Sequence, residues 1–217
     1  MEADTPRIEK YLESIFKLQQ IQHPVTVSRL AVHLKLYIPS VSEMVRKLIN
    51  KGLVSQTKKG IFLTEKGNSI AIKVIRRHRL SERLLTDILG FKWDEVHEKA
   101  CKLEHAISPQ VEERIAKILE NPKTCPHGHP IPDKNGAITE EKVMLLSELK
   151  AYEEGIIVSV FEEDSKMLQY FSSLGLIPGT TVRLEEIAPL GSVFVVRVSG
   201  SRHDVGKEVA SKIHIKK

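Results

Sequence analysis

Metal-binding side chains spaced four residues apart over residues 78–105 restrict the fold of this chain more than any other feature. Side chains four apart share one face of an α-helix, so each half of the stretch predicts a helix. Residues 87–93, centred on Gly90, interrupt the two runs and predict a short turn between antiparallel helices. The side chains in the stretch that can bind a transition metal are His78, Glu82, His97, Glu98, Cys101, Glu104 and His105.

Nitrogen, sulfur and oxygen donors gathered in one place indicate a first-row divalent metal rather than calcium or magnesium. Taken singly, a histidine or glutamate at helical spacing is more often solvated, and a lone cysteine is more often a small buried side chain. The joint spacing of the whole set favours the metal site. HEKAC at residues 97–101 approaches the zinc-protease motif H-E-x-x-H, but cysteine replaces its second histidine, which argues against a protease.

The composition is that of a globular chain. Its 217 residues suffice for one large domain or two small ones, and the net charge of +5 modestly favours a polyanionic partner. No apolar run approaches the ~18–20 residues that cross a bilayer, and the N-terminus lacks the apolar core of a signal peptide. We therefore expect a cytoplasmic protein without a membrane partner, whose two cysteines are available to metal rather than to a disulfide framework.

Residues 1–65 have the pattern of a winged helix-turn-helix. Apolar side chains at helical spacing predict a first helix from Thr5 to about Gln20, then helices over residues 28–34 and 39–51. Gly52 suits the end of the third helix. Two β-rich runs within residues 53–63 flank a Lys-Lys-Gly turn, which predicts the wing.

The polar face of the third helix and the wing tip form the predicted DNA-binding surface. The first turn of a recognition helix approaches base edges most closely, and lysines at a hairpin tip suit phosphate contacts. Glu43 repels phosphate, so it either accepts a hydrogen bond from cytosine N4 or points to solvent. A winged helix used only for protein contacts is the alternative, against which the exposed serines and cations argue. The predicted DNA-binding residues are Ser28, Pro39, Ser40, Ser42, Glu43, Arg46, Lys47, Lys58 and Lys59.

Residues 66–140 predict a helical domain that carries the metal donors and a dimer surface. A helix capped at Thr64 is expected to reach Leu85, and another to span residues 108–119 after the donor-bearing pair. Their surplus apolar surface suits a two-fold homodimer. A palindromic operator needs such a dimer, because two recognition helices must lie about 34 Å, or a multiple of it, apart.

A proline-rich loop over residues 121–135 contains Cys125, His127 and His129 in alternation. These three side chains suggest either a third metal site or a structural loop. We favour the structural loop, because alternating ligands on a rigid segment rarely complete a tetrahedron alone.

Residues 148–217, after a connector over residues 136–147, predict a small open β-barrel. Short β-rich runs at 155–161, 181–187, 192–198 and 208–215 are separated by Pro-Gly and Ser-Gly turns, with one helical segment over 165–173. The predicted fold class is therefore α+β, with domains over residues 1–65, 66–140 and 148–217.

Three motifs, HRLSERLLTDILGF, VHEKACKLEH and CPHGHPIP, resemble the diphtheria-toxin-repressor (iron-dependent regulator) family of metal-activated transcription repressors, over essentially the whole chain. MLQYFSSLGLIPGTTVRL likewise resembles the ferrous-transport-protein-A type of Src-homology-like barrel. The resemblance implies two metal positions per subunit. The implied ligands are His78, Glu82 and His97 at an ancillary position, and Cys101, Glu104 and His105 with one first-helix residue at a primary position.

Lys10 departs from the family at that first-helix position, where members carry methionine or aspartate. A protonated lysine offers no lone pair and repels a cation. Two interpretations stay open. Either Glu9 or Glu13 substitutes for the missing ligand, or the primary position is weakened and the ancillary position holds the metal.

The resemblance implies that the barrel can lend ligands to the ancillary position. The matching side chains here are Asp164 and Met167, with Glu162 and Glu163 as competitors, and a barrel that only packs on the dimer is the alternative. The thiolate of Cys101 favours ferrous iron, cobalt, nickel or zinc over manganese. The expected metal is therefore ferrous iron, with manganese, cobalt, nickel or zinc as alternatives.

The function expected from these features is metal-dependent repression of transcription that controls metal homeostasis. Metal binding would set a homodimer to the geometry that double-stranded operator DNA requires. One alternative is a metalloenzyme, although the sequence has no nucleophile elbow or phosphate loop. The other alternative is a nucleic-acid-binding protein with structural zinc.

Overall fold

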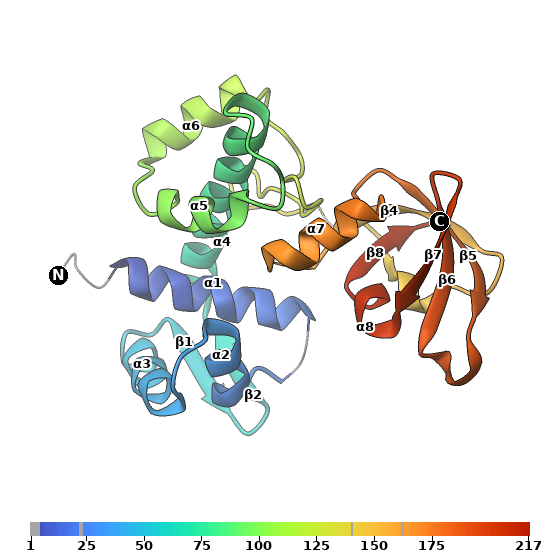
Figure 1. Ribbon diagram of the computed structural model, residues 1–217. Helices are drawn as coiled ribbons and strands as arrows, with labels where there is room; N and C mark the ends of the chain where they lie inside the picture. The colour runs from blue at the N-terminus through green and yellow to red at the C-terminus, as the bar shows by residue number, and fades with distance from the viewer. Residues whose placement is uncertain (1–4, 22–23, 140, 162) are drawn as a thin grey trace. The chain divides into compact units, whose positions relative to one another are not determined.

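The computed structural model describes residues 5–21, 24–139, 141–161 and 163–217, which fall into two units (Figure 1). One unit comprises Met1–Arg77 with Pro132–Ala137, and the other comprises His78–Ile131 with Ile138–Lys217. Helix α4 (Glu65–Arg83) passes through the boundary in the sequence between them. Among the described residues, no helix has the length and apolar character needed to cross a membrane.

The first unit contains a three-helix head with a two-stranded wing. Its elements are α1 (Thr5–Ile21), α2 (Val27–Leu34), α3 (Ile38–Asn50), β1 (Val54–Thr57) and β2 (Gly60–Leu63). The two strands pair antiparallel, with Thr57 opposite Gly60, so Lys58 and Lys59 form the turn. The helix-turn-helix and its wing lie where the sequence predicts them.

Local signals explain the helix ends in this head. The Thr26 hydroxyl caps α2 by accepting a hydrogen bond from the Arg29 amide at 3.2 Å. Lys35 then takes a left-handed conformation (φ 55°) that turns the chain into α3. Helix α3 buries one stripe of apolar side chains, so its opposite face is left to polar ones. The buried stripe consists of Val41, Met44, Val45 and Leu48.

The second unit begins with the C-terminal part of α4. A short π-helix, η1 (Leu84–Ile88), follows, and then come α5 (Val96–Leu103) and α6 (Pro109–Ile118). The predicted helix to Leu85 therefore ends in a wider turn at Arg83, a local form that often occurs at functional sites. Leu80, Ile107 and Ile115 form the small core that holds these helices together.

A six-stranded antiparallel sheet of order β3-β8-β4-β5-β6-β7 completes the second unit. Helix α7 (Ser165–Ser173) lies between β4 and β5 in sequence, and its Phe171 is buried in the barrel core. In β5, β6 and β8 alternate residues face that core, as period-2 patterning requires. The strands are β3 (Met144–Leu145), β4 (Glu154–Val160), β5 (Thr181–Ile187), β6 (Val193–Val198), β7 (Ser201–Gly206) and β8 (Ile213–Lys216).

The predicted strand over residues 208–215 is wrong in its first half. Residues Lys207–Ala210 form a short helix, α8, and only Ile213–Lys216 is extended. The prediction missed the two-residue strand β3, which lies in the predicted connector. It also missed β7, whose polar sequence gives no apolar alternation. It forms because Ser199 and Gly200, at φ 48° and 85°, make a tight hairpin turn that carries the chain back along β6.

Candidate metal centre and DNA-binding surface

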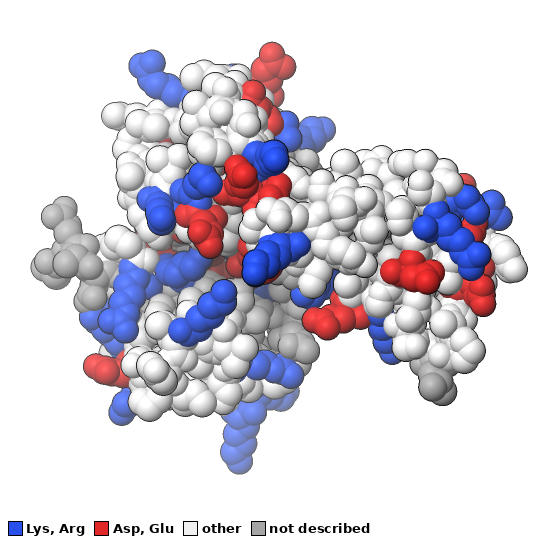
Figure 2. Space-filling model, in the orientation of Figure 1, with Lys and Arg blue, Asp and Glu red and all other residues white. Residues whose placement is uncertain are grey.

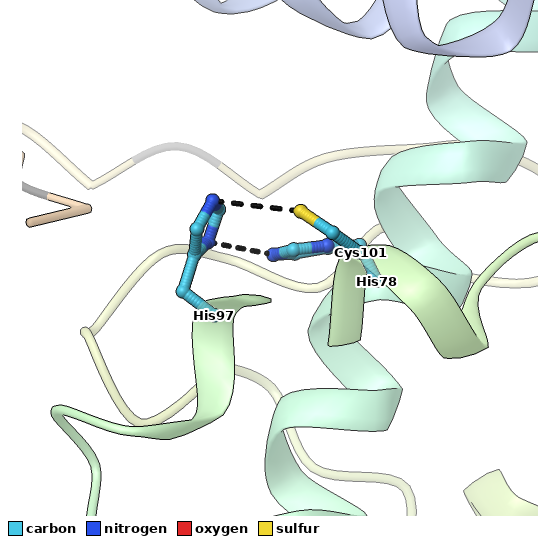
Figure 3. A group of neighbouring side chains, drawn as sticks. All are labelled: His78, His97 and Cys101. Carbon is cyan, nitrogen blue, oxygen red and sulfur yellow. Dashed lines mark hydrogen bonds between the residues drawn. The ribbon is translucent and has the colours of Figure 1, made fainter. Parts of the chain in front are cut away.

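Helices α4 and α5 bring two histidines and a cysteine together (Figure 3). The Nε2 atom of His78 lies 3.2 Å from Nδ1 of His97, and Nε2 of His97 lies 3.6 Å from the Cys101 sulfur. His78 is buried, whereas His97 and Cys101 are half-buried. One donor atom from each lies within 4.8 Å of the others, so the four-residue spacings do converge in space.

Glu82 connects this group to a second one. Its Oε1 atom lies 3.1 Å from Nε2 of His78, 3.5 Å from Nδ1 of His97 and 3.3 Å from Nδ1 of His127. Glu82, Cys125 and His127 are all buried, and one donor atom from each falls within 4.8 Å of the others. One interpretation of the sequence was a metal site of Cys125, His127 and His129. In the structure the third member of the group is Glu82, which the sequence did not connect with this loop.

His129 lies apart from the second group among the described residues, and its Nε2 atom is 3.1 Å from the carbonyl oxygen of Val160. The loop itself is well anchored. The guanidinium of Arg79 donates to the carbonyl of Pro130, and Ile131 donates its amide to Lys123 at 2.7 Å. The loop is therefore held in place by hydrogen bonds, as a structural loop would be, and it also carries two possible metal ligands, Cys125 and His127.

Burial in this cluster favours the uncharged form of each side chain, but neighbouring charges and hydrogen bonds have the larger effect on the pKa values. Burial lowers the pKa of His78, yet the charge of Glu82 and hydrogen bonds to Cys101 and Glu104 hold that pKa well above its ordinary value. For Glu82 burial acts upwards, but the charges of His78 and His127 keep its pKa well below the ordinary value.

The same balance applies to the remaining donors. Hydrogen bonds to Cys101 and Glu163 overcome burial and raise the pKa of His97 to about 10, and the charge of Glu82 does the same for His127. Against burial, hydrogen bonds from His78 and His97 lower the pKa of the Cys101 thiol to about 6. Buried anions are thus balanced by imidazole protons. A divalent cation can displace such protons, so the donor set fits a metal.

Glu104 and His105, which the family resemblance implies as ligands together with Cys101, contact each other, and Glu104 also contacts His78. The buried Glu104 carboxylate lies 2.5 Å from Nδ1 of His78 and 3.2 Å from Nε2 of His105. Within the described residues of this unit, Cys101 groups with His78 and His97 rather than with Glu104 and His105. Glu104 therefore orients the His78 ring from the side opposite Glu82.

On the barrel side, Glu163 is the acidic neighbour of the cluster, with its Oε2 atom 3.2 Å from Nε2 of His97. Asp164 caps α7 by accepting the Met167 amide at 3.1 Å, and the Met167 side chain packs on the barrel core. Glu162, the other competitor, lies outside the described residues.

On the first helix, Glu13 is buried between two lysines. The Lys17 ammonium lies 2.7 Å from one carboxylate oxygen, and the Lys10 ammonium lies 3.1 Å from the other. Glu9 pairs with Arg77 at 2.8 Å. Both acidic candidates from this helix therefore have basic partners within their own unit.

The DNA-binding candidates lie on the outward face of the head. Ser28, Ser40, Glu43 and Arg46 are exposed, and a shallow hollow on α3 is lined by residues 43, 46, 47, 50 and 51. Pro39 and the wing-tip residues Lys58 and Lys59 are also exposed, while Ser42 and Lys47 are half-buried. Figure 2 shows lysine and arginine side chains gathered over the head on the face drawn.

Tyr37 is a surface residue that the sequence prediction did not include. It precedes α3 and is 85% exposed, although tyrosine usually buries its ring. An aromatic residue directly before the predicted recognition helix is the sequence signal that would have pointed to it.

Three domain families match consecutive parts of the chain. The iron dependent repressor N-terminal DNA binding domain matches residues 5–61, the iron dependent repressor metal binding and dimerisation domain matches residues 64–133, and the FeoA domain matches residues 144–217. The chain is 31% identical over 222 residues to the iron-dependent repressor IdeR of Mycobacterium leprae, with 96% of each chain covered. The chain belongs to the iron-dependent repressor family.

Solved structures of metal-dependent repressors resemble this repressor over almost its whole length. A manganese-dependent transcriptional repressor in complex with manganese superposes with a TM-score of 0.91 at 31% identity, covering 96% of this chain and 98% of that one. ScaR with bound Zn²⁺ gives a TM-score of 0.85 at 32% identity, covering 97% and 99%.

Family membership confirms the predicted fold class of winged head, helical domain and small Src-homology-like barrel. It also confirms the predicted class of function, which is metal-dependent transcriptional repression rather than catalysis. DNA binding and dimerisation belong to the matched domains, and α6 of this repressor exposes Val111 and Ile118.

Proposed function

We propose that this repressor binds a divalent transition metal through the donors of α4 and α5 and, once loaded, binds operator DNA through α3 and the wing. The observation that carries the proposal is the convergence of His78, His97 and Cys101 beside Glu82, in a chain whose head is a winged helix-turn-helix. An ion there would supply positive charge in place of the imidazole protons.

Two donor groups meet at Glu82, which belongs to the second and lies within 3.5 Å of both histidines of the first, and we assign metal binding to both. The first is His78, His97 and Cys101, and the second is Glu82, Cys125 and His127. Their nitrogen and thiolate donors favour ferrous iron, cobalt, nickel or zinc, with manganese disfavoured by sulfur. The similar structures carry manganese in one case and zinc in another, which supports a site of this general class.

The remaining predicted ligands have supporting roles in this proposal. Glu104 and His105 orient the cluster, and Glu163 is the barrel side chain next to it, ahead of Asp164 and Met167. Glu13 is not included, because its carboxylate is already paired with two lysines.

The DNA-binding assignment follows the residues predicted on α3 and the wing. Two heads of a homodimer would read a palindromic operator with half-sites about 34 Å, or a multiple of it, apart. A repressor of this kind acts where the chromosome lies, so we place it in the cytoplasm. The proposed division of labour is residues 1–65 for DNA, 66–140 for metal and dimerisation, and 148–217 for the barrel.

Metal and operator must reinforce each other's binding by the same free energy, because linkage is reciprocal. A gel-shift titration with ferrous iron, manganese or chelator tests this directly. We expect operator binding with metal and its loss on brief chelation. Binding that resists brief chelation would indicate structural zinc instead.

The double variant His78→Ala, Glu82→Ala should abolish the metal response. A matched control is His203→Ala, Glu208→Ala, which removes the same residue types from the barrel surface. An unchanged metal response in the first variant would overturn the assignment of the donors.

A further inference from the structure

Strand β4 has an open edge at its C-terminal end. It pairs with β5 over residues 154–156, and Ile157 bonds to Gly179 and Thr180 just before β5. Beyond that point a β-bulge at Val158 interrupts its pairing with β8. Backbone groups on an open edge need other partners. The donor-bearing loop of residues 125–131 supplies them.

Two hydrogen bonds attach this loop to the strand. The Val160 amide donates to the carbonyl of His127 at 3.0 Å, and Nε2 of His129 donates to the carbonyl of Val160 at 3.1 Å. The His129 ring also meets the Phe161 ring edge-on at 4.4 Å. The side chain that does not join the donor group therefore fastens the loop to the barrel.

The other side of the loop faces the metal donors. Nε2 of His127 donates to the carbonyl of Trp93 at 2.9 Å, which leaves Nδ1 as the nitrogen that faces Glu82 at 3.3 Å. The Trp93 side chain packs against the barrel core. The orientation of His127 is thus set by its backbone bond to β4 and by a residue that touches the barrel.

Gly128 makes the close approach of loop and strand possible. Its φ is +85°, a conformation that L side chains rarely adopt. A Cβ atom there would lie 1.9 Å from the carbonyl oxygen of Val158 and 2.8 Å from Cα of Ser159. Both obstacles are backbone, so any larger residue would push the loop off β4.

We propose that Gly128 is a positioning residue for metal binding. By docking the loop on β4 it presents Cys125 and His127 to Glu82, so metal binding at this group and docking of the barrel reinforce each other. The inference rests on the proposed function, specifically on the second donor group, and adds that the barrel's attachment responds to metal.

The test uses cobalt(II) and the full chain with Cys101→Ser. Because the chain has two cysteines, thiolate-to-cobalt charge-transfer absorption then reports Cys125 alone. Gly128→Ala in this background should weaken cobalt binding by about 10–100-fold, the usual effect of losing a group that orients a ligand. Gly200→Ala is the matched control, because Gly200 has the same φ of +85° but nothing within 4 Å of a Cβ.

Hydrogen exchange gives a second readout that needs no glycine variant. Cobalt should slow exchange of the Val160 amide in the Cys101→Ser chain, because that amide is bonded to His127. Equal cobalt affinity in the two glycine variants, absence of the thiolate band, or exchange at Val160 that ignores cobalt would each overturn the inference. Metal-dependent operator binding tests the proposed function separately, so the two failures are distinguishable.

Discussion

Glu82 and Glu13 are both buried carboxylates, yet their partners belong to different chemical classes. An imidazole can give up its proton to an incoming metal ion and then offer it a nitrogen lone pair. A lysine ammonium keeps its proton and has no lone pair to offer. Burial and charge alone therefore do not make a metal site, because the partners must also be able to become ligands. The facing side chains are His78, His97 and His127 for Glu82 and, within its own unit, Lys10 and Lys17 for Glu13.

The largest effect is expected from Glu82→Gln. It removes the carboxylate that belongs to the second donor group and lies within 3.5 Å of both histidines of the first, so metal affinity should fall about 100-fold. Leaving buried imidazole protons without their carboxylate should also cost about 3–5 kcal/mol of the free energy of unfolding. Isothermal titration with cobalt and urea unfolding measure the two losses.

Glu13→Gln sharpens the comparison, because it changes an equally buried carboxylate in the same way. It should lower stability and leave cobalt affinity unchanged. A fall in affinity similar to that of Glu82→Gln would mean that the first helix contributes a ligand, as one interpretation of the sequence has it.

The pH dependence of stability should follow the imidazoles. His97 and His127 have pKa values of about 10 when folded against 6.5 ordinarily, so their contribution is complete below pH 6.5 and lost by about pH 10. Cys101, with its pKa lowered from 9.0 to about 6, acts in the opposite direction between those values.

Two imidazoles outweigh one thiol, so the free energy of unfolding in chelator should fall between pH 7 and 9, by on the order of 1 kcal/mol per pH unit. Metal affinity should rise over the same range, because binding releases protons. Urea titrations at several pH values check the first trend and cobalt titrations the second. Stability that rises from pH 7 to 9 would contradict the charge balance assigned to the cluster.

Lys10→Met tests whether the region around Glu13 can be made to bind metal. With one ammonium removed, we expect about one additional cobalt per chain and a loss of about 1 kcal/mol or less, because Lys10 is about one-third exposed (34%). Anaerobic calorimetry gives the stoichiometry, with Lys17→Met as the control that leaves Lys10 in place. An unchanged stoichiometry would show that a partner's charge is not what excludes metal there.

Arg46→Ala should have the smallest effect on metal binding, because Arg46 lies on the DNA-binding head. It should lower operator affinity and reduce the slope of its salt dependence by about one, while cobalt affinity stays the same. Arg202→Ala, on the barrel surface, is the control. Loss of metal binding in Arg46→Ala would mean that the head and the donors do not work as separate parts.

Local spacing explains what the sequence could predict. Four-residue steps place His78 with Glu82 and His97 with Cys101, and the turn after α4 brings the pairs together. The second group could not be predicted, because Glu82 and His127 are brought together by a loop that docks on the β4 edge. No local pattern encodes that docking. Strand β7 was missed for a related reason, since pairing with β6 rather than its own composition makes it extended.

Helix α4 has a mechanical consequence for this repressor. It is continuous from Glu65 to Arg83, and its first metal donor, His78, stands about 20 Å along the axis from its beginning. If the helix stays rigid, a small tilt at one end becomes a larger displacement at the other. A tilt of about 10° at the donor end would move the opposite end by about 3 Å, comparable to the length of one hydrogen bond to DNA.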